Sequence, residues 1–149
     1  MFDRNGSHER EVVGFVGDDI GMTMAQRSKF FYVLSQLHPQ EFHHEDYKGS
    51  CIDAHDCAVF RHVAIHVYPL TDDEEGNGSD GSLQKVLPHP QRLMVLLHTC
   101  EALIVAPNEM NMRKSSRIRY AATAMKNLGR PVYIIYPDGT IEKEEQNEN

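Results

Sequence analysis

The stretch from Gln91 to Ala106, QRLMVLLHTCEALIVA, decides the fold. Its first nine residues follow two prolines and form an apolar segment of helical length, which predicts a helix over Gln91–Thr99. Its last five residues, Ala102–Ala106, are apolar without interruption. Such a run is typical of a strand that is buried on both faces in the centre of a parallel sheet. The stretch therefore predicts a helix that leads into the central strand of an α/β sheet.

Outward from this stretch, segments typical of strands and helices alternate along the chain. Further strands are predicted at Glu11–Val16, Glu41–His44, Val63–Tyr68 and Pro131–Tyr136. Helices are predicted from Thr23 to His38, from Ser50 to Phe60, and from Ser115 or Ser116 to Gly129. The pairs Thr23 with Gln26 and Ser50 with Asp53 each match the pattern of a helix N-terminal cap. This order predicts an α/β fold, Rossmann-like and doubly wound, with a mostly parallel sheet of about five strands.

Length and charge define one domain with two acidic segments. The 149 residues suit a single domain, which we place at 1–140. The net charge of −7 is concentrated in a loop at 71–82 and in the tail at 141–149, and the rest of the chain is close to neutral. We expect the tail to be disordered and the long loop, between Pro69 and Pro90, to be either a lid or disordered. A near-neutral body argues against nucleic acid as a partner.

The same composition points to the cytoplasm. No apolar run is long enough to span a bilayer, and Met1–Arg10 lacks the apolar core of a signal peptide. The three cysteines, an odd number, are expected to be reduced thiols. We therefore expect a cytoplasmic protein that does not bind a membrane.

Three loops are predicted to meet at the ligand-binding edge of the sheet. In open parallel sheets, ligands bind beyond the carboxyl ends of the strands and at helix N-termini. The loops that reach this edge are Gly17–Thr23, His44–Ser50 and Pro107–Ser116. The last of them ends in Arg113-Lys114-Ser115-Ser116-Arg117, a cationic, serine-rich helix start that suits an anion.

Five motifs in order resemble those of the SLOG superfamily. They are G-D-D-I-G-M-T-M-A-Q from Gly17, H-H-E-D-Y-K-G-S-C-I-D-A-H from His43, L-I-V-A-P from Leu103, R-K-S-S-R-I-R-Y-A from Arg113 and G-R-P-V-Y-I-I-Y-P-D-G from Gly129. The resemblance, from about Val12 to Gly139, implies a Rossmann-like fold that handles nucleotides or their derivatives. Some superfamily members are phosphoribohydrolases, some bind cyclic ADP-ribose isomers, and others bind single-stranded DNA.

Departures from the family pattern favour binding over catalysis. The phosphoribohydrolase motif P-G-G-x-G-T-x-x-E has no counterpart after Pro107, so the expected general acid/base is missing. Asp18 and Asp19 stand where a phosphate would meet a helix N-terminus, and they suit ribose hydroxyls better. We predict no catalytic residue. In the alternative of an enzyme, Glu45, Asp18 or Glu109 would take the acid/base role.

A metal ion is not expected. His43, His44, Asp53, His55, Asp56 and Cys57 lie close together in the sequence, but their spacing matches no familiar metal motif. We therefore predict neither a metal nor a cofactor.

These observations predict a protein that binds a nucleotide-derived small molecule. The expected use is sequestration of a signal such as a cyclic ADP-ribose isomer, as in a phage protein that acts against a host defence in the host cytoplasm. The alternatives are an N-glycosidase acting on a nucleoside 5′-monophosphate and a single-stranded DNA-binding protein. A homo-oligomer, either dimer or tetramer, is expected. The predicted ligand-binding residues are Gly17, Asp18, Asp19, Gly21, Met22, Thr23, His44, Lys48, Gly49, Ser50, Asp53, Arg92, Pro107, Asn108, Arg113, Lys114, Ser115, Ser116 and Arg117.

Overall fold

A computed structural model gives the fold of the chain and describes residues 10–72, 74, 76, 78–111 and 115–145. The described strands are β1 (Val12–Gly17), β2 (Glu41–Glu45), β3 (Ala64–Tyr68), β4 (Ser82–Leu83), β5 (Ala102–Ala106), β6 (Val132–Ile135) and β7 (Ile141–Glu144). The helices are α1 (Met24–Leu37), α2 (Ser50–Phe60), α3 (Gln91–Thr99) and α4 (Ser116–Asn127).

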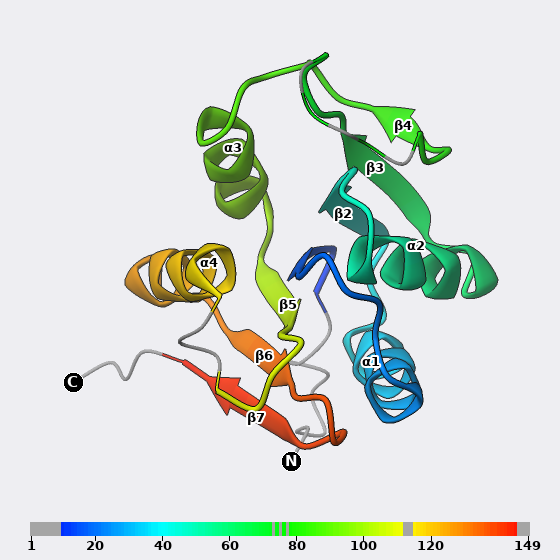
Figure 1. Cartoon of the computed structure of the whole chain (residues 1–149), viewed down its shortest axis with the longest axis vertical. Coiled ribbons are helices and arrows are strands. Elements are labelled where there is room, and N and C mark those ends of the chain that lie inside the picture. The colour runs from blue at the N-terminus through cyan, green and yellow to red at the C-terminus, as the bar shows by residue number, and fades with distance from the viewer. Residues whose placement is uncertain (1–9, 73, 75, 77, 112–114, 146–149) are drawn as a thin grey trace.

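The strands form one seven-stranded sheet in the order β4-β3-β2-β1-β5-β6-β7. All neighbours are parallel except β6 and β7, which are antiparallel. The strand order reverses direction at β1, and α1 and α2 cover one face while α3 and α4 cover the other (Figure 1). The predicted doubly wound α/β fold is therefore confirmed. The predicted number of about five strands is wrong, because the described chain has seven.

The two additional strands lie at the edges of the sheet. β4 is a two-residue strand within the loop that was expected to be a lid or disordered, and it pairs with β3. β7 contradicts the predicted disorder of 141–149 over Ile141–Glu144. Its first residue, Ile141, packs on the core, and the turn at Pro137-Asp138-Gly139 returns the chain beside β6. Residues 146–149 of the tail lie outside the described residues.

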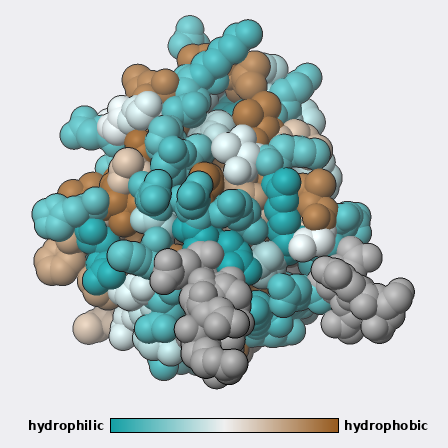
Figure 2. All heavy atoms as spheres, turned by 180° about the vertical axis from the view of Figure 1, so that it is seen from behind, coloured by the Kyte–Doolittle hydropathy of each residue, from teal (hydrophilic) through white to brown (hydrophobic). Residues whose placement is uncertain are grey.

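Each face of the sheet has its own apolar core. Phe15, Phe30 and Phe42 pack together under α1 and α2, with ring centroids 5.5–6.4 Å apart. Leu93, Leu96 and other residues of α3 and α4 bury the opposite face. On the outside, Figure 2 shows that apolar groups of the back face lie in separate patches among hydrophilic ones.

Helix caps and one buried amide position the carboxyl edge of the sheet. The predicted capping box of Thr23 and Gln26 is confirmed at the start of α1. The Gln26 side chain is buried, and its Nε2 also donates to the carbonyls of Pro107 and Ile135, 2.7 and 2.9 Å away. This one amide therefore joins α1 to the ends of β5 and β6.

Candidate functional site

A cavity of about 430 Å³ lies beyond the carboxyl end of β2, between the first turns of α3 and α4. Its volume lies within the range of small-molecule sites, about 300–1,000 Å³. The cavity is lined by Tyr47, His89, Leu93, Ser116, Arg117 and Tyr120. Its position agrees with the edge at which open parallel sheets bind ligands.

Arg117 is the charged group of this cavity. Its guanidinium carbon lies 4.3 Å from the centroid of the Tyr47 ring, and its Nη2 donates to the Gly17 carbonyl at the end of β1. Its Nε is buried and has no hydrogen-bond partner within the described part of the chain. A buried donor without an acceptor costs about 1–3 kcal/mol, so an acceptor supplied by a ligand would recover that cost.

A network of buried charges forms the wall behind Tyr47. Arg92, which is fully buried, donates from Nε to Glu45, 2.6 Å away, and from Nη2 to the Tyr47 hydroxyl, also 2.6 Å away. Its Nη1 and Nη2 also donate to the two carboxylate oxygens of Glu74, at 2.8 and 3.0 Å. A carbonyl, that of Leu87, accepts the remaining Nη1 hydrogen bond. All five N–H groups of Arg92 are thus used within the protein.

The network lowers the pKa of one loop carboxylate. Hydrogen bonds from Arg92 bring the pKa of Glu74 to about 2, and bonds from Thr71 act in the same direction. Glu74 belongs to the acidic loop. A carboxylate from that loop therefore binds the Nη1 and Nη2 atoms of the Arg92 guanidinium. Burial also raises the pKa of Tyr47, which keeps its hydroxyl protonated beside the cavity.

Asp18 joins two of the predicted loops. Its Oδ2 accepts from the Asn108 backbone N–H at 2.8 Å, and its Oδ1 accepts from the Ser115 hydroxyl at 2.7 Å. Ser115 is also the N-cap of α4. Both Asp18 oxygens therefore bind groups of the protein, close to the cavity residues Ser116 and Arg117.

The loops after β1 and β2 interlock through a glycine. Gly49 has φ +89°, and a Cβ at this position would lie 2.4 Å from the Asp19 carbonyl carbon. Ser50 donates to the Asp18 carbonyl from its backbone N–H and from its hydroxyl, at 3.1 and 3.0 Å. The predicted cap of α2 is consequently wrong: Gly49 is the N-cap and Ser50 is the first helical residue, with its hydroxyl bonded elsewhere.

Four other predicted ligand residues do not line the cavity. Met22 is buried in the core under α1 and α2, and its backbone N–H donates to Asp53, 2.7 Å away. Thr23 caps α1 and donates from its hydroxyl to the Pro137 carbonyl. Gly21 lies next to Asp53, since a Cβ on it would be 3.0 Å from that carboxylate. Asp53 is thus a partner of the first loop and not a cap of its own helix.

His44 is a buried neutral imidazole. Its Nδ1 lies 2.7 Å from the Glu45 carbonyl, so Nδ1 carries the proton, and its Nε2 accepts from Nδ1 of His55, 2.9 Å away. Burial lowers the pKa of His44 to about 4. The pair lies under α2, with the His44 ring 5.9 Å from that of Phe42.

The structure thus brings together part of the predicted site. Ser116 and Arg117 line the cavity, while Gly17, Asp18, Gly49, Ser50, Asn108 and Ser115 join the loops beneath it. Asp19 and Lys48 are exposed, and Pro107 is buried with its carbonyl bound to Gln26. Arg92 is buried behind the cavity, saturated by protein acceptors. Arg113 and Lys114 lie outside the described residues.

Sequence reasoning missed four lining residues. Tyr47 lies within the motif that begins at His43, and its aromatic ring before Lys48-Gly49 was a usable signal. His89, Leu93 and Tyr120 come from two helix starts and a loop that no sequence spacing relates to one another. Their convergence depends on how α3 and α4 pack side by side.

Within the described residues, no helix is both long and apolar enough to cross a membrane. Comparisons with models of protein families, with curated proteins and with solved structures find no match to this chain.

Proposed function

We propose that this protein binds a nucleotide-derived anion in the cavity beside Arg117 and retains it without chemical change. The motif resemblance to the SLOG superfamily supports a nucleotide derivative, and a cyclic ADP-ribose isomer is the first candidate. Sequestration of such a signal, by a phage protein in the cytoplasm of its host, is the use that we infer for this binding.

The observation that carries this proposal is the state of Arg117. Arg117 lines a cavity of ligand size at the first turn of α4, and its buried Nε has no hydrogen-bond partner among the described residues. Helix N-termini and arginine both favour phosphate oxygens. Tyr47 supplies an aromatic surface against the same guanidinium, and Tyr120 supplies another ring in the lining, both of which suit a base.

The contacts of the carboxylates favour binding over hydrolysis. An N-glycosidase needs a carboxyl group that is free to exchange a proton near the substrate. Glu45 is buried against Arg92, and both oxygens of Asp18 accept hydrogen bonds from the protein. Neither group lines the cavity.

The test is a retention experiment with the full chain. The protein is incubated with nucleoside monophosphates, dinucleotides and cyclic ADP-ribose isomers, washed by filtration and denatured, and both fractions are analysed by mass spectrometry. We expect one intact compound to be released only on denaturation. Free base and ribose phosphate in the filtrate would instead establish the N-glycosidase, and retention of none of the compounds would refute the proposal.

A matched pair of variants then tests the site. Arg117→Gln should weaken binding of the retained compound about 10–100-fold, because it removes a charge-assisted hydrogen bond worth about 1.5–3 kcal/mol. Arg119→Gln is the control, since Arg119 is exposed on the same helix and does not line the cavity. Equal affinities of the two variants would place the ligand elsewhere. Sedimentation of the same samples measures the expected dimer or tetramer.

A further inference from the structure

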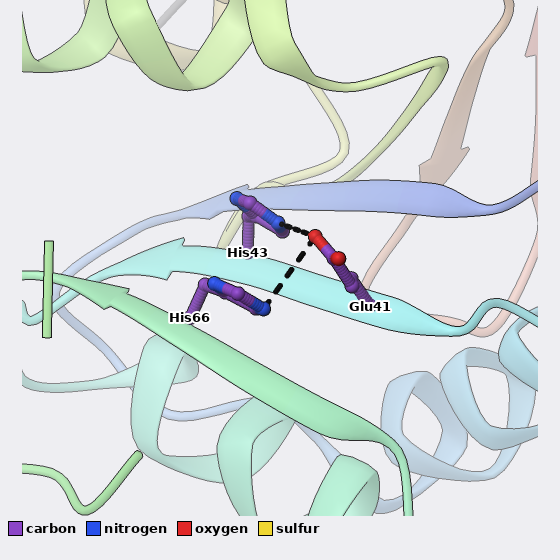
Figure 3. Close-up of side chains that lie close together, drawn as sticks. All are labelled: Glu41, His43 and His66. Atoms are coloured by element: carbon purple, nitrogen blue, oxygen red, sulfur yellow. Dashed lines mark hydrogen bonds and ion pairs between the residues drawn. The ribbon is translucent and has the colours of Figure 1, made fainter. Parts of the chain in front are cut away.

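Three potential metal ligands converge on one face of the sheet, away from the cavity. Glu41 and His43 are two residues apart on β2, so their side chains project from the same face. His66 on β3 is the register partner of His43. Figure 3 shows the two imidazole rings side by side, with the Glu41 carboxylate at their ends. Strand geometry alone, without any loop, thus places the three groups together.

The distances suit one small cation. Oε1 of Glu41 lies 2.9 Å from Nε2 of His43 and 3.5 Å from Nε2 of His66. All three ligand atoms lie within 4.8 Å of one another. Tetrahedral ligands at about 2.0–2.2 Å from Zn²⁺ are about 3.3–3.6 Å apart, so shifts of about 1 Å would close the set around an ion. The Glu41 side chain is 41% exposed and is free to make such a shift.

Each imidazole ring is also held by a contact to Nδ1, the ring nitrogen that does not face Glu41. Nδ1 of His43 lies 2.8 Å from the Tyr68 hydroxyl, and Nδ1 of His66 lies 3.1 Å from the side-chain amide of Gln84. Both Nε2 atoms therefore point to Glu41, the position that a shared cation would take. Metal-binding histidines are usually oriented in this way, by a partner on the nitrogen that does not bind the metal. If the Gln84 amide turned over, its oxygen would accept a hydrogen bond from a protonated Nδ1 of His66, which leaves Nε2 of that ring for the metal.

We propose that Glu41, His43 and His66 form a binding site for one divalent transition-metal ion, with Zn²⁺ as the best match. Two imidazoles and one carboxylate are a ligand set that Zn²⁺ uses when one position stays open to solvent. Mg²⁺ and Ca²⁺ prefer sites made of oxygen ligands, so they fit this set poorly. None of the three residues lines the cavity, and the site does not depend on the proposed nucleotide ligand.

Binding requires a specific movement of His66. The two rings are stacked, with planes 7° apart and centroids 4.4 Å apart. Because each nitrogen lone pair lies in its ring plane, one ion cannot lie in both parallel planes, and the rings must open. The His43 side chain is 4% exposed and packs against Tyr68, whereas that of His66, on the strand next to the edge strand β4, is 23% exposed. His66 is therefore the ring that turns.

The experiment is a metal titration of the full, untagged chain after removal of metal by a chelator and desalting. Zn²⁺ affinity is measured by competition with a chromophoric chelator, and Co²⁺ serves as the spectroscopic probe. We expect one ion per chain, a tetrahedral Co²⁺ spectrum without thiolate charge-transfer bands, and a higher Tm with Zn²⁺. NMR should show the ring protons of His66 shifting on saturation. Absence of saturable binding at one ion per chain, or a thiolate spectrum, would overturn the proposal.

Variants test the assignment of the ligands. His66→Ala and Glu41→Gln, both at partly exposed positions, should each weaken Zn²⁺ binding at least about tenfold, the lower limit for losing a supporting contact of a metal site. His98→Ala, an exposed histidine on α3, is the matched control and should bind as the parent does. Circular dichroism verifies that each variant is folded. Unchanged binding in folded His66→Ala would refute the site.

Discussion

At the scale of single residues, Arg92 is a predicted ligand contact whose hydrogen bonds all go to the protein itself. It was predicted to touch the ligand, yet all five of its N–H groups bind protein acceptors, and Glu74 takes two of them. Burial disfavours the charge, but Glu74 and Glu45 more than offset this and raise the pKa of Arg92. A ligand anion would reach Arg92 only by displacing Glu74. Glu74 is therefore one of several contacts between the acidic loop and the body, beside the hydrogen bonds from the Gly78 and Ser79 N–H groups to Asp46 and the pairing of β4 with β3.

This contact predicts how stability depends on pH. The pKa of Glu74 in the folded protein, about 2, lies below its usual value of 4.5. The Glu74 contribution is therefore complete above about pH 4.5 and disappears as the pH falls from 4.5 towards 2. We expect Glu74→Gln to cost about 1.5–3 kcal/mol at neutral pH, as for the loss of a charged hydrogen bond, and to cost little near pH 2. Urea unfolding at several pH values measures the difference.

The control for this prediction is Asp72→Asn in the same loop. Asp72 is exposed, so its replacement changes the charge of the loop without touching Arg92. The two variants should separate above pH 4.5. If both unfold as the parent does at neutral pH, the Glu74 contact does not stabilise the fold.

At the scale of elements, the loops after β1 and β2 depend on close backbone contact. Gly49 requires both a positive φ of 89° and room for the Asp18-Asp19 backbone, whose atoms would lie 2.4–2.7 Å from an added Cβ. Gly78 has a similar φ of 69°, but nothing lies within 4 Å of its Cβ position. Gly78 therefore needs glycine only for its backbone conformation, whereas Gly49 also needs it because a Cβ would clash with the neighbouring backbone.

Alanine at each position should give different losses of stability. Gly78→Ala should cost about 1–2 kcal/mol, the penalty of left-handed backbone. Gly49→Ala should cost at least about 3 kcal/mol, because the clash with backbone atoms adds to the same penalty. Thermal unfolding of both variants provides the measurement. Similar losses would mean that the loops can separate without cost.

The same loops show why sequence reasoning predicted elements better than contacts. The bounds of α3 and β5 agree with the prediction, because apolar length and proline boundaries are local signals. The pair Ser50 and Asp53 matched a capping pattern, but both side chains bind the first loop. A cap and a contact between loops use the same residue types, and their sequence spacing does not distinguish them.

At the scale of the whole molecule, a binding site is likewise harder to predict from sequence when it depends on contacts between distant segments. The carboxyl edge of the sheet was predictable from the alternation of strands and helices, and Ser116 and Arg117 do line a cavity there. The cluster of Glu41, His43 and His66 was not predictable, because it depends on the register between β2 and β3. Charge density likewise gave a wrong expectation for β7, where pairing with β6 outweighs the acidic composition.

The C-terminal strand protects an edge of the molecule, which predicts the effect of its removal. β7 pairs with β6 over Val132–Ile135, a strand that is fully buried, and Ile141 packs on the core beneath it. A chain ending at Gly139 would expose the β6 edge and its apolar residues to solvent and to other chains. We expect a loss of at least about 2 kcal/mol, which lowers Tm by about 4–8 °C at this size, together with aggregation on heating. A chain ending at Glu145 keeps β7 and should match the parent in calorimetry and light scattering. If the shorter chain is equally stable and does not aggregate on heating, then β7 contributes neither stability nor protection of the β6 edge.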